Sequence, residues 1–154
     1  MNFNSIKIGL IMCSLTFFGC TKNSERAIIC SQSIPPLYLN FNVVDKSTGA
    51  DYFFSPTPAF SIKDMYFFKI HDVTRKDTIR PDVDGIGLSR SFRLRLDNTK
   101  LNDTLIVKVG NTPESRLIHK LKQSQDVCPE YVIDKILFND LEIPSVNTKY
   151  ILRN

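Results

Sequence analysis

Eight consecutive residues, Leu37-Tyr38-Leu39-Asn40-Phe41-Asn42-Val43-Val44, decide the fold class of this chain. A large apolar side chain occupies every second position from Leu37, and the positions between are mostly Tyr or Asn. Because successive side chains of a strand point to opposite faces of a sheet, this period of two predicts a β-strand with one buried face. The following Asp45-Lys46-Ser47-Thr48-Gly49 is typical of a turn, since Asp and Ser side chains bond nearby backbone and Gly permits positive φ.

The same alternation recurs further along the chain. In a predicted strand at Leu88–Asp97, Phe92 and Leu94 take one face while Arg93 and Arg95 take the other. Further strands are predicted at Met65–Asp72, Thr104–Val109, Leu117–Leu121, Tyr131–Phe138, Leu141–Ile143 and Thr148–Leu152.

Turn signals separate these strands, and helical periodicity is weak. Asn139-Asp140 fits a two-residue hairpin turn, and Asp77–Gly87 is a longer turn region. The best helix candidate, Thr112–Gln125, lacks a convincing apolar recurrence at helical spacing. Many short strands with regular turns favour an all-β fold, and we expect a single antiparallel β-sandwich of about seven to nine strands over residues 34–154.

The composition agrees with one globular domain. The chain has 154 residues, of which 42% are apolar and 23% charged, which excludes a disordered or collagen-like chain. It has only 2 His, 4 Cys and no Trp, so little material is present for a metal centre or a histidine-based catalytic site. We therefore expect no metal site, no cofactor and no enzymatic activity.

The N-terminal sequence predicts a secretory signal peptide. Lys7 precedes an uncharged, largely apolar segment, Ile8–Phe18, which is shorter than the roughly 20 residues that a membrane-spanning helix needs. Gly19-Cys20 and a polar run follow. Residues 1–19 are predicted to be removed, and residues 20–33 to form a tether.

Phe17-Phe18-Gly19-Cys20 resembles the lipobox of bacterial lipoproteins. Gly19 and Cys20 fit that pattern, whereas Phe17 stands where leucine is usual and Phe18 where a small residue is common. The resemblance implies cleavage before Cys20 and acylation of its thiol, and several acyl chains hold a protein firmly on a membrane. Cys13, behind the bulky Met12, is the poorer acceptor. Simple secretion without a lipid remains the alternative.

Two cysteines are left after such processing, Cys30 and Cys128. An exported chain meets an oxidising compartment, so this even pair predicts a disulfide, with two unpaired thiols as the alternative. Removal of Met1–Gly19 also removes Lys7 and lowers the net charge from +4 to about +3. A charge this small does not indicate a nucleic-acid partner.

The segment from Pro36 to Phe54 resembles a recurring pattern in small lipoproteins of Bacteroidota-type bacteria. In that pattern a first strand ends in a V-D-K-x-T-G-x-D-hydrophobic-F segment, matched here by Val44-Asp45-Lys46-Ser47-Thr48-Gly49-Ala50-Asp51-Tyr52-Phe53. Tyr131-x-Ile133 and Phe138-Asn139 resemble the end of the same proteins. The resemblance implies an immunoglobulin-like or transthyretin-like sandwich and brings no catalytic residue.

Residues with catalytic or metal-binding chemistry are sparse. His71 and His119 have no nucleophile motif beside them, and both are expected at the surface or its boundary. Asp82-Val83-Asp84-Gly85 brings two carboxylates to a turn, which suits calcium, but a structural turn is the favoured interpretation because the distal ligands of a calcium loop are missing.

One candidate ligand surface consists of Arg90, Arg93 and Arg95. Arginines on one strand face can bind an anionic glycan or lipid headgroup. The alternative is that their charge only keeps an exposed strand edge from pairing with another chain. The aromatic clusters Tyr52–Phe54 and Tyr66–Phe68 suit stacking on sugars, but we expect them mainly in the core.

These features predict a non-catalytic lipoprotein, anchored to the outer membrane through Cys20, that binds an envelope protein or a glycan. A carbohydrate-binding accessory module is the alternative.

Overall fold

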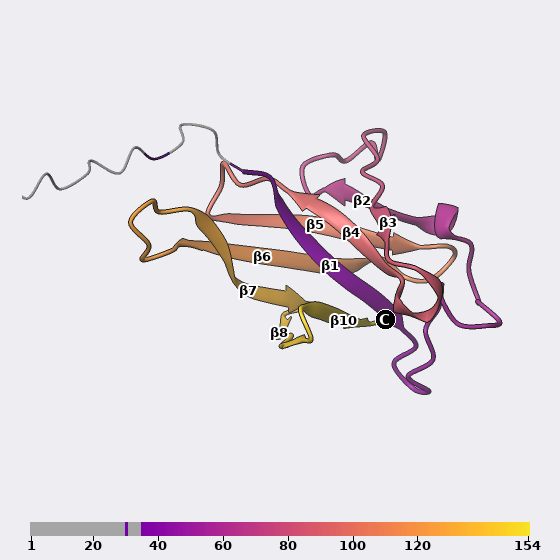
Figure 1. Cartoon of the computed structure of the whole chain (residues 1–154). Helices are drawn as coiled ribbons and strands as arrows, with labels where there is room; N and C mark the ends of the chain where they lie inside the picture. Colours follow the sequence, from indigo (N-terminus) through magenta and orange to yellow (C-terminus); the bar gives the residue numbers. More distant parts are fainter. Residues whose placement is uncertain (1–29, 31–34) are drawn as a thin grey trace, which may run out of the picture.

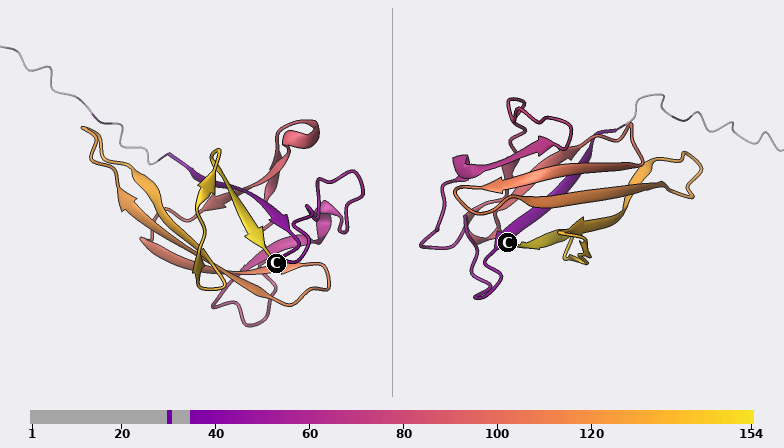
Figure 2. Two further views of the ribbon diagram at one scale, coloured as in Figure 1. Left: turned by 90° about the horizontal axis from the view of Figure 1, so that it is seen from below. Right: turned by 180° about the vertical axis from the view of Figure 1, so that it is seen from behind.

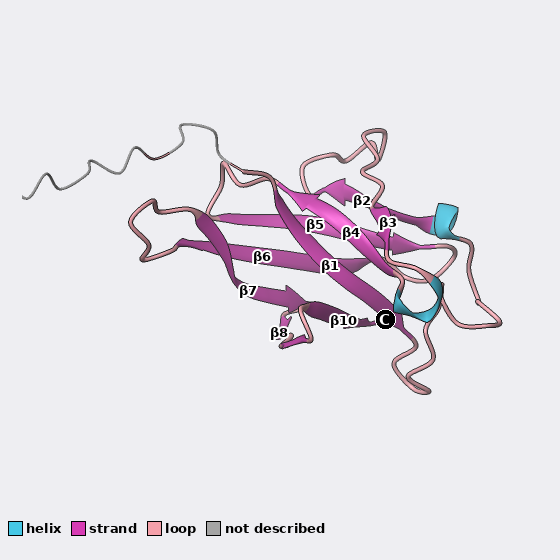
Figure 3. Ribbon diagram, viewed as in Figure 1, coloured by secondary structure: helices cyan, strands magenta, loops and turns pink. Residues whose placement is uncertain are grey.

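The computed structural model describes Cys30 and residues 35–154 (Figure 1). Residues 1–29 and 31–34, which include the lipidation candidate Cys20 and all of the predicted tether except Cys30, lie outside the described residues. The described part is nearly all β and forms two packed sheets, which confirms the predicted all-β sandwich (Figure 3). None of its helices has the length and hydropathy that crossing a membrane requires.

Each sheet has five strands. Sheet A has the order β3 (Asp82–Asp84), β4 (Ser91–Leu96), β1 (Leu37–Val44), β10 (Lys149–Arg153) and β9 (Ser145–Val146). Sheet B has the order β2 (Met65–Lys69), β5 (Asn102–Val109), β6 (Ser115–Gln123), β7 (Tyr131–Phe138) and β8 (Leu141–Glu142). Two single-turn 3₁₀ helices, Ile62–Asp64 and Gly87–Ser89, interrupt the loops.

The described part has ten strands, at least one more than expected, because two short strands escaped the sequence patterns. The three-residue β3 lies inside the predicted turn region Asp77–Gly87, and the two-residue β9 follows Pro144. Neither strand is long enough to show an alternation. The helix candidate Thr112–Gln125 mostly forms β6.

One strand pair departs from the expected antiparallel arrangement. β1 pairs with β10 in parallel, with Phe41 opposite Tyr150 and Val43 opposite Leu152, whereas all other strand pairs in the described part are antiparallel. Parallel strands need a long connection, and the chain between β1 and β10 runs through both sheets before it returns. The C-terminal strand thus completes the sheet that the first strand begins (Figure 2).

The core lies between the two sheets. Phe41 of β1 is fully buried, packs edge-on against Phe67 of sheet B at a ring-centroid distance of 5.7 Å, and stacks on Phe92 at 5.5 Å. Phe53 and Phe54, from the loop after β1, also pack against Phe92, each at 4.9 Å. The inward alternation read from the sequence therefore matches the buried positions, and the aromatic clusters do supply the core.

Candidate functional site

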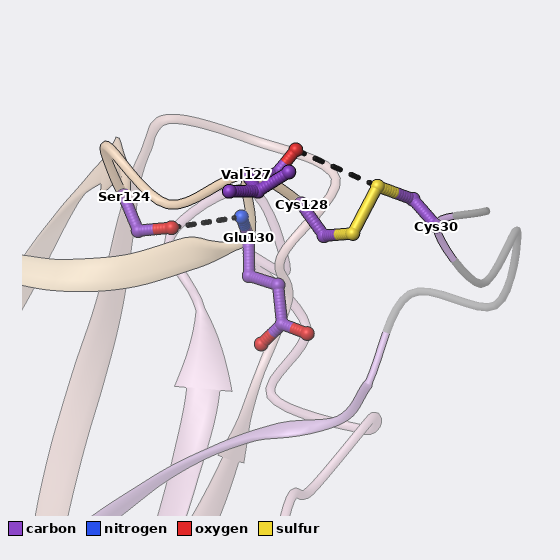
Figure 4. Close-up of a disulfide and its surroundings, with 5 residues drawn as sticks. All are labelled: Cys30, Ser124, Val127, Cys128 and Glu130. Atoms are coloured by element: carbon purple, nitrogen blue, oxygen red, sulfur yellow. Dashed lines mark hydrogen bonds between the residues drawn. A yellow bond between two sulfur atoms is a disulfide. The ribbon is translucent and has the colours of Figure 1, made fainter. Parts of the chain in front are cut away.

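The disulfide ties the start of the domain to the loop between β6 and β7 (Figure 4). Cys30 and Cys128 are 98 positions apart in sequence, and their Cα atoms are 5.4 Å apart. The loop that carries Cys128 is closed at its base, where the Ser124 amide donates to the Glu130 carbonyl at 2.7 Å and the Glu130 amide donates to Ser124 Oγ at 3.1 Å. The bond therefore joins the segment before β1 to a turn that two hydrogen bonds close.

This disulfide end is also where the chain enters the sandwich. The Asn98 side chain, from the loop between β4 and β5, donates to the Pro35 carbonyl at 2.8 Å, just before β1 begins. From there β1 runs to the opposite end, where Val44 pairs with Arg153 beside the C-terminus. The disulfide loop and the C-terminus thus lie towards opposite ends of the sandwich (Figure 1).

The three predicted arginines are only partly brought together. Arg93 and Arg95 point outward from β4, and the Arg93 guanidinium lies 3.9 Å from the centroid of the Tyr38 ring. Arg90 precedes the strand, and its guanidinium lies 5.0 Å from the Phe54 ring centroid. None of the three forms an ion pair with a carboxylate in the described part of the chain.

Asp82 and Asp84 take the same face of sheet A as Arg93, because Asp82 lies opposite Arg93 and Asp84 opposite Ser91. Among residues 35–154 and Cys30, no cluster of three or more His, Cys, Asp or Glu side chains is arranged to hold a metal ion. Gly85 has φ of +90°, and a Cβ there would approach the Ser89 carbonyl oxygen to 2.7 Å. The structure thus shows why this segment needs its glycine.

The two histidines have different surroundings. His71 is exposed in the loop after β2, and the neighbouring Asp72 accepts hydrogen bonds from Thr74 Oγ1 and from the Asp77 amide, so this carboxylate shapes the loop. His119 is fully buried on the inner face of β6, and neither ring nitrogen has a hydrogen-bond partner. The expectation that His119 lies at the surface or boundary was wrong.

The buried position of His119 changes its chemistry. Removal from water disfavours the imidazolium, so burial lowers the pKa of His119 below its usual 6.5, although the carboxylates of Asp103 and Asp97 oppose this shift. A neutral, enclosed imidazole has no access to a substrate. His119 therefore belongs to the core.

A pocket of about 270 Å³ opens at the side of the sandwich, between the β7–β8 hairpin and β10. Its walls are mainly apolar, and two cations, one anion and one amide complete the lining. The lining residues are Lys46, Phe138, Asn139, Leu141, Glu142, Ile143, Pro144, Ile151 and Arg153. We call this cavity the side pocket.

The sequence patterns did not reveal the side pocket. Lys46 follows β1 and Arg153 ends β10, and only the parallel β1–β10 pairing brings the two together. No local sequence signal marked the side pocket, because the 72% exposure of Leu141 after the hairpin turn is visible only in the structure. A leucine held in solvent at a turn is a weak indication of a binding surface.

The aromatic clusters give no argument for stacking on sugars. Phe53, Phe54, Phe67 and Phe68 are all buried. Tyr66 is half-buried, and its ring lies 5.8 Å from the Arg80 guanidinium.

In comparisons with known proteins, no family model, no curated protein and no solved structure matches the chain.

Proposed function

We propose that the protein is a non-catalytic binding module of a bacterial cell envelope, held on the outer membrane by acyl chains on Cys20. The observation that carries this proposal is the Gly19-Cys20 pair at the end of a short uncharged apolar segment. Two or more acyl chains bind a bilayer firmly, because each buried methylene contributes about 0.8 kcal/mol.

The disulfide determines which end of the domain the predicted tether reaches. About ten residues separate Cys20 from Cys30, which at full extension span roughly 35 Å. Because Cys30 is bonded to Cys128, this length limits the distance of the disulfide end from an anchored Cys20. The opposite end, with the loop after β1 and the C-terminus, could then lie farther from the membrane than the disulfide end.

The outer face of sheet A is the surface we propose for contact with an anionic partner in the envelope. Arg93 and Arg95 point outward from β4, and the Tyr38 ring supports the Arg93 guanidinium at 3.9 Å. Guanidinium groups recognise carboxylates and phosphates through paired hydrogen bonds. The enclosure of His119 and the use of Asp72 as a loop acceptor favour binding over catalysis.

The experiment compares the wild-type protein with two variants in the native envelope, with fatty-acid labelling and pull-down as readouts. Cys20→Ser is expected to abolish acyl labelling. The double variant Arg93→Gln/Arg95→Gln is expected to stay acylated and to lose at least about tenfold of the partner recovered, because charge-assisted hydrogen bonds are removed.

Matched controls come from the same chain. Cys13→Ser should leave labelling unchanged, because Cys13 lies inside the apolar segment. Lys63→Gln, an exposed substitution in the loop before β2, should leave partner recovery unchanged. Acyl labelling that persists in Cys20→Ser would refute the anchor, and equal recovery by the arginine variant would refute the contact surface.

A further inference from the structure

The side pocket has the size and lining of a binding site for a small ligand. Pockets for drug-sized ligands measure roughly 300–1,000 Å³, so a volume of about 270 Å³ suits a smaller molecule. Phe138, Ile143 and Ile151 form apolar wall, and the largely exposed Leu141 stands in the same lining. Covering these side chains with an apolar group would remove their surface from water, which favours binding.

The polar groups of the lining are mostly engaged within the protein. Glu142 receives a hydrogen bond from Lys135 Nζ at 3.0 Å, so its carboxylate is already paired with a cation. The Asn139 side-chain oxygen accepts from the Arg116 amide at 2.9 Å, and its nitrogen donates to Ser115 Oγ at 3.1 Å. Neither Glu142 nor Asn139 therefore sets the preferred charge of a ligand.

The two remaining polar side chains are both cationic. Lys46 and Arg153 are exposed, and neither side chain forms an ion pair or hydrogen bond with any of the described residues. The backbone fixes their positions, since the Lys46 amide donates to the Asn154 carbonyl at 3.0 Å and Arg153 pairs with Val44. An apolar cavity with two uncommitted cations is complementary to an anion that carries an apolar body.

We propose that the side pocket binds a small amphipathic carboxylate. Its hydrocarbon part packs against Leu141, Ile143 and Ile151, and its carboxylate pairs with Arg153 and Lys46. This proposal rests on the function proposed above, because it gives the binding module a ligand class, but it requires no lipid on Cys20.

The test uses the full chain carrying Cys20→Ser, purified without detergent, so that acyl chains do not compete for the pocket. Three probes share one eight-carbon chain and differ in their head group: octanoate, 1-octanol and octylamine. Binding is followed by chemical-shift changes of backbone amides during titration. We expect saturable binding of octanoate with shifts concentrated at Lys46, Leu141–Ile143 and Ile151–Arg153, weaker binding of 1-octanol, and no saturable binding of octylamine.

Three variants separate the contributions. Arg153→Gln should weaken octanoate binding about tenfold or more and leave 1-octanol binding unchanged, because only the carboxylate uses the charge. Leu141→Ser should weaken both probes, because it removes apolar wall. Lys63→Gln is the matched control, since it removes an exposed cation that belongs neither to the side pocket nor to the arginine surface of β4.

Three results would overturn the proposal: no saturable octanoate shift, equal binding of octanoate and octylamine, or an unchanged octanoate affinity in Arg153→Gln. Failure of the membrane anchor would alter none of these measurements, because the tested chain carries no lipid. Absence of acyl labelling in the wild-type protein together with octanoate binding would reject the anchor and retain the ligand site.

Discussion

Single aspartates shape the backbone of the loop after β1. Asp45 Oδ1 accepts hydrogen bonds from the backbone amides of Ser47 and Thr48, and these and side-chain hydrogen bonds hold the pKa of Asp45 well below its usual range. Asp51 Oδ1 accepts from the amides of Phe53 and Phe54 at 2.8 Å each, which turns both rings towards the core. The D-x-x-x-x-x-D spacing that resembles a lipoprotein pattern is thus explained by loop folding.

His119 is the residue whose burial has the clearest consequence for stability. Above about pH 7.5, one unit above its usual pKa of 6.5, it is neutral in both the folded and unfolded chain, so it adds no pH dependence there. As the pH falls below 6.5, the unfolded chain binds a proton first, because burial lowers the folded pKa. The free energy of unfolding should therefore decrease from about pH 6.5 downwards, by at most about 1.4 kcal/mol per pH unit.

His119→Leu should remove this decrease. It should also raise the free energy of unfolding at pH 7 by roughly 1–3 kcal/mol, because two buried ring nitrogens without partners are replaced by apolar groups. Urea unfolding between pH 5 and 7.5 measures both effects. His71→Gln is the matched control and should keep the wild-type dependence, since His71 is exposed. The same slope in His119→Leu as in the wild type would contradict this assignment.

Two short turns show how local geometry builds the elements at the side of the sandwich. Asn139 and Asp140 join β7 to β8 with φ of 50° and 67°, and Asn147 and Thr148 join β9 to β10 with φ of 49° and 66°. Consecutive positive φ values are the hallmark of a type I′ hairpin turn. The sequence predicted the first turn, whereas the second was missed together with the two-residue β9.

Asn139 and Asn147 both have a positive φ in a hairpin turn but differ in their side-chain hydrogen bonds, so their alanine variants can be compared directly. In either variant, alanine must adopt the left-handed conformation of the asparagine it replaces. Alanine disfavours positive φ, so each substitution should lower the free energy of unfolding by about 1 kcal/mol. Asn139→Ala also removes the hydrogen bonds to the Arg116 amide and Ser115 Oγ. We therefore expect Asn139→Ala to cost about 2–3 kcal/mol of unfolding free energy and Asn147→Ala about 1 kcal/mol. Equal losses in denaturant unfolding would show that the side-chain bonds of Asn139 contribute nothing.

At the scale of the whole molecule, a disulfide holds one end of the domain and hydrogen bonds of Asn154 hold the other. Cys30 joins the entering segment to the β6–β7 loop, and Asn154 joins the C-terminus to neighbouring elements. The Asn154 amide donates to the Val44 carbonyl at 3.1 Å, and its side chain bonds Ser115 Oγ at 2.7 Å and Thr112 Oγ1 at 3.0 Å. These contacts fix β10 in sheet A and thereby position the side pocket.

Loss of the disulfide should destabilise the domain without changing its fold. The bond closes a loop of 98 positions, for which the chain-entropy model gives about 4–5 kcal/mol as an upper value. Because Cys30 lies outside both sheets, Cys30→Ser/Cys128→Ser should retain the β-rich circular dichroism spectrum and lose roughly 2–4 kcal/mol of unfolding free energy.

Intact mass supplies the control for this prediction. The unreduced mature wild type should be lighter than its reduced form by two hydrogen atoms, and the double variant should show no such difference. An unreduced wild type with the mass of the dithiol would mean that the bond does not form.

The sequence alone determined most of the strands, the inward faces of those that alternate clearly, and the hairpin at Asn139-Asp140. These features are local, since side-chain alternation depends on a residue's immediate neighbours and turn geometry on one or two residues. The cysteine pair was also predictable, because the processing that the sequence predicts at Cys20 would leave only Cys30 and Cys128 as thiols.

Only the tertiary structure decided which strands pair and what those pairings bring together. The parallel β1–β10 contact, the enclosure of His119 and the juxtaposition of Lys46 with Arg153 all join segments far apart in the chain. An alternating strand specifies which face is buried but not which neighbour it takes, because many strands offer the same backbone hydrogen bonds. Packing of the complete core selects among them, and that selection creates the side pocket.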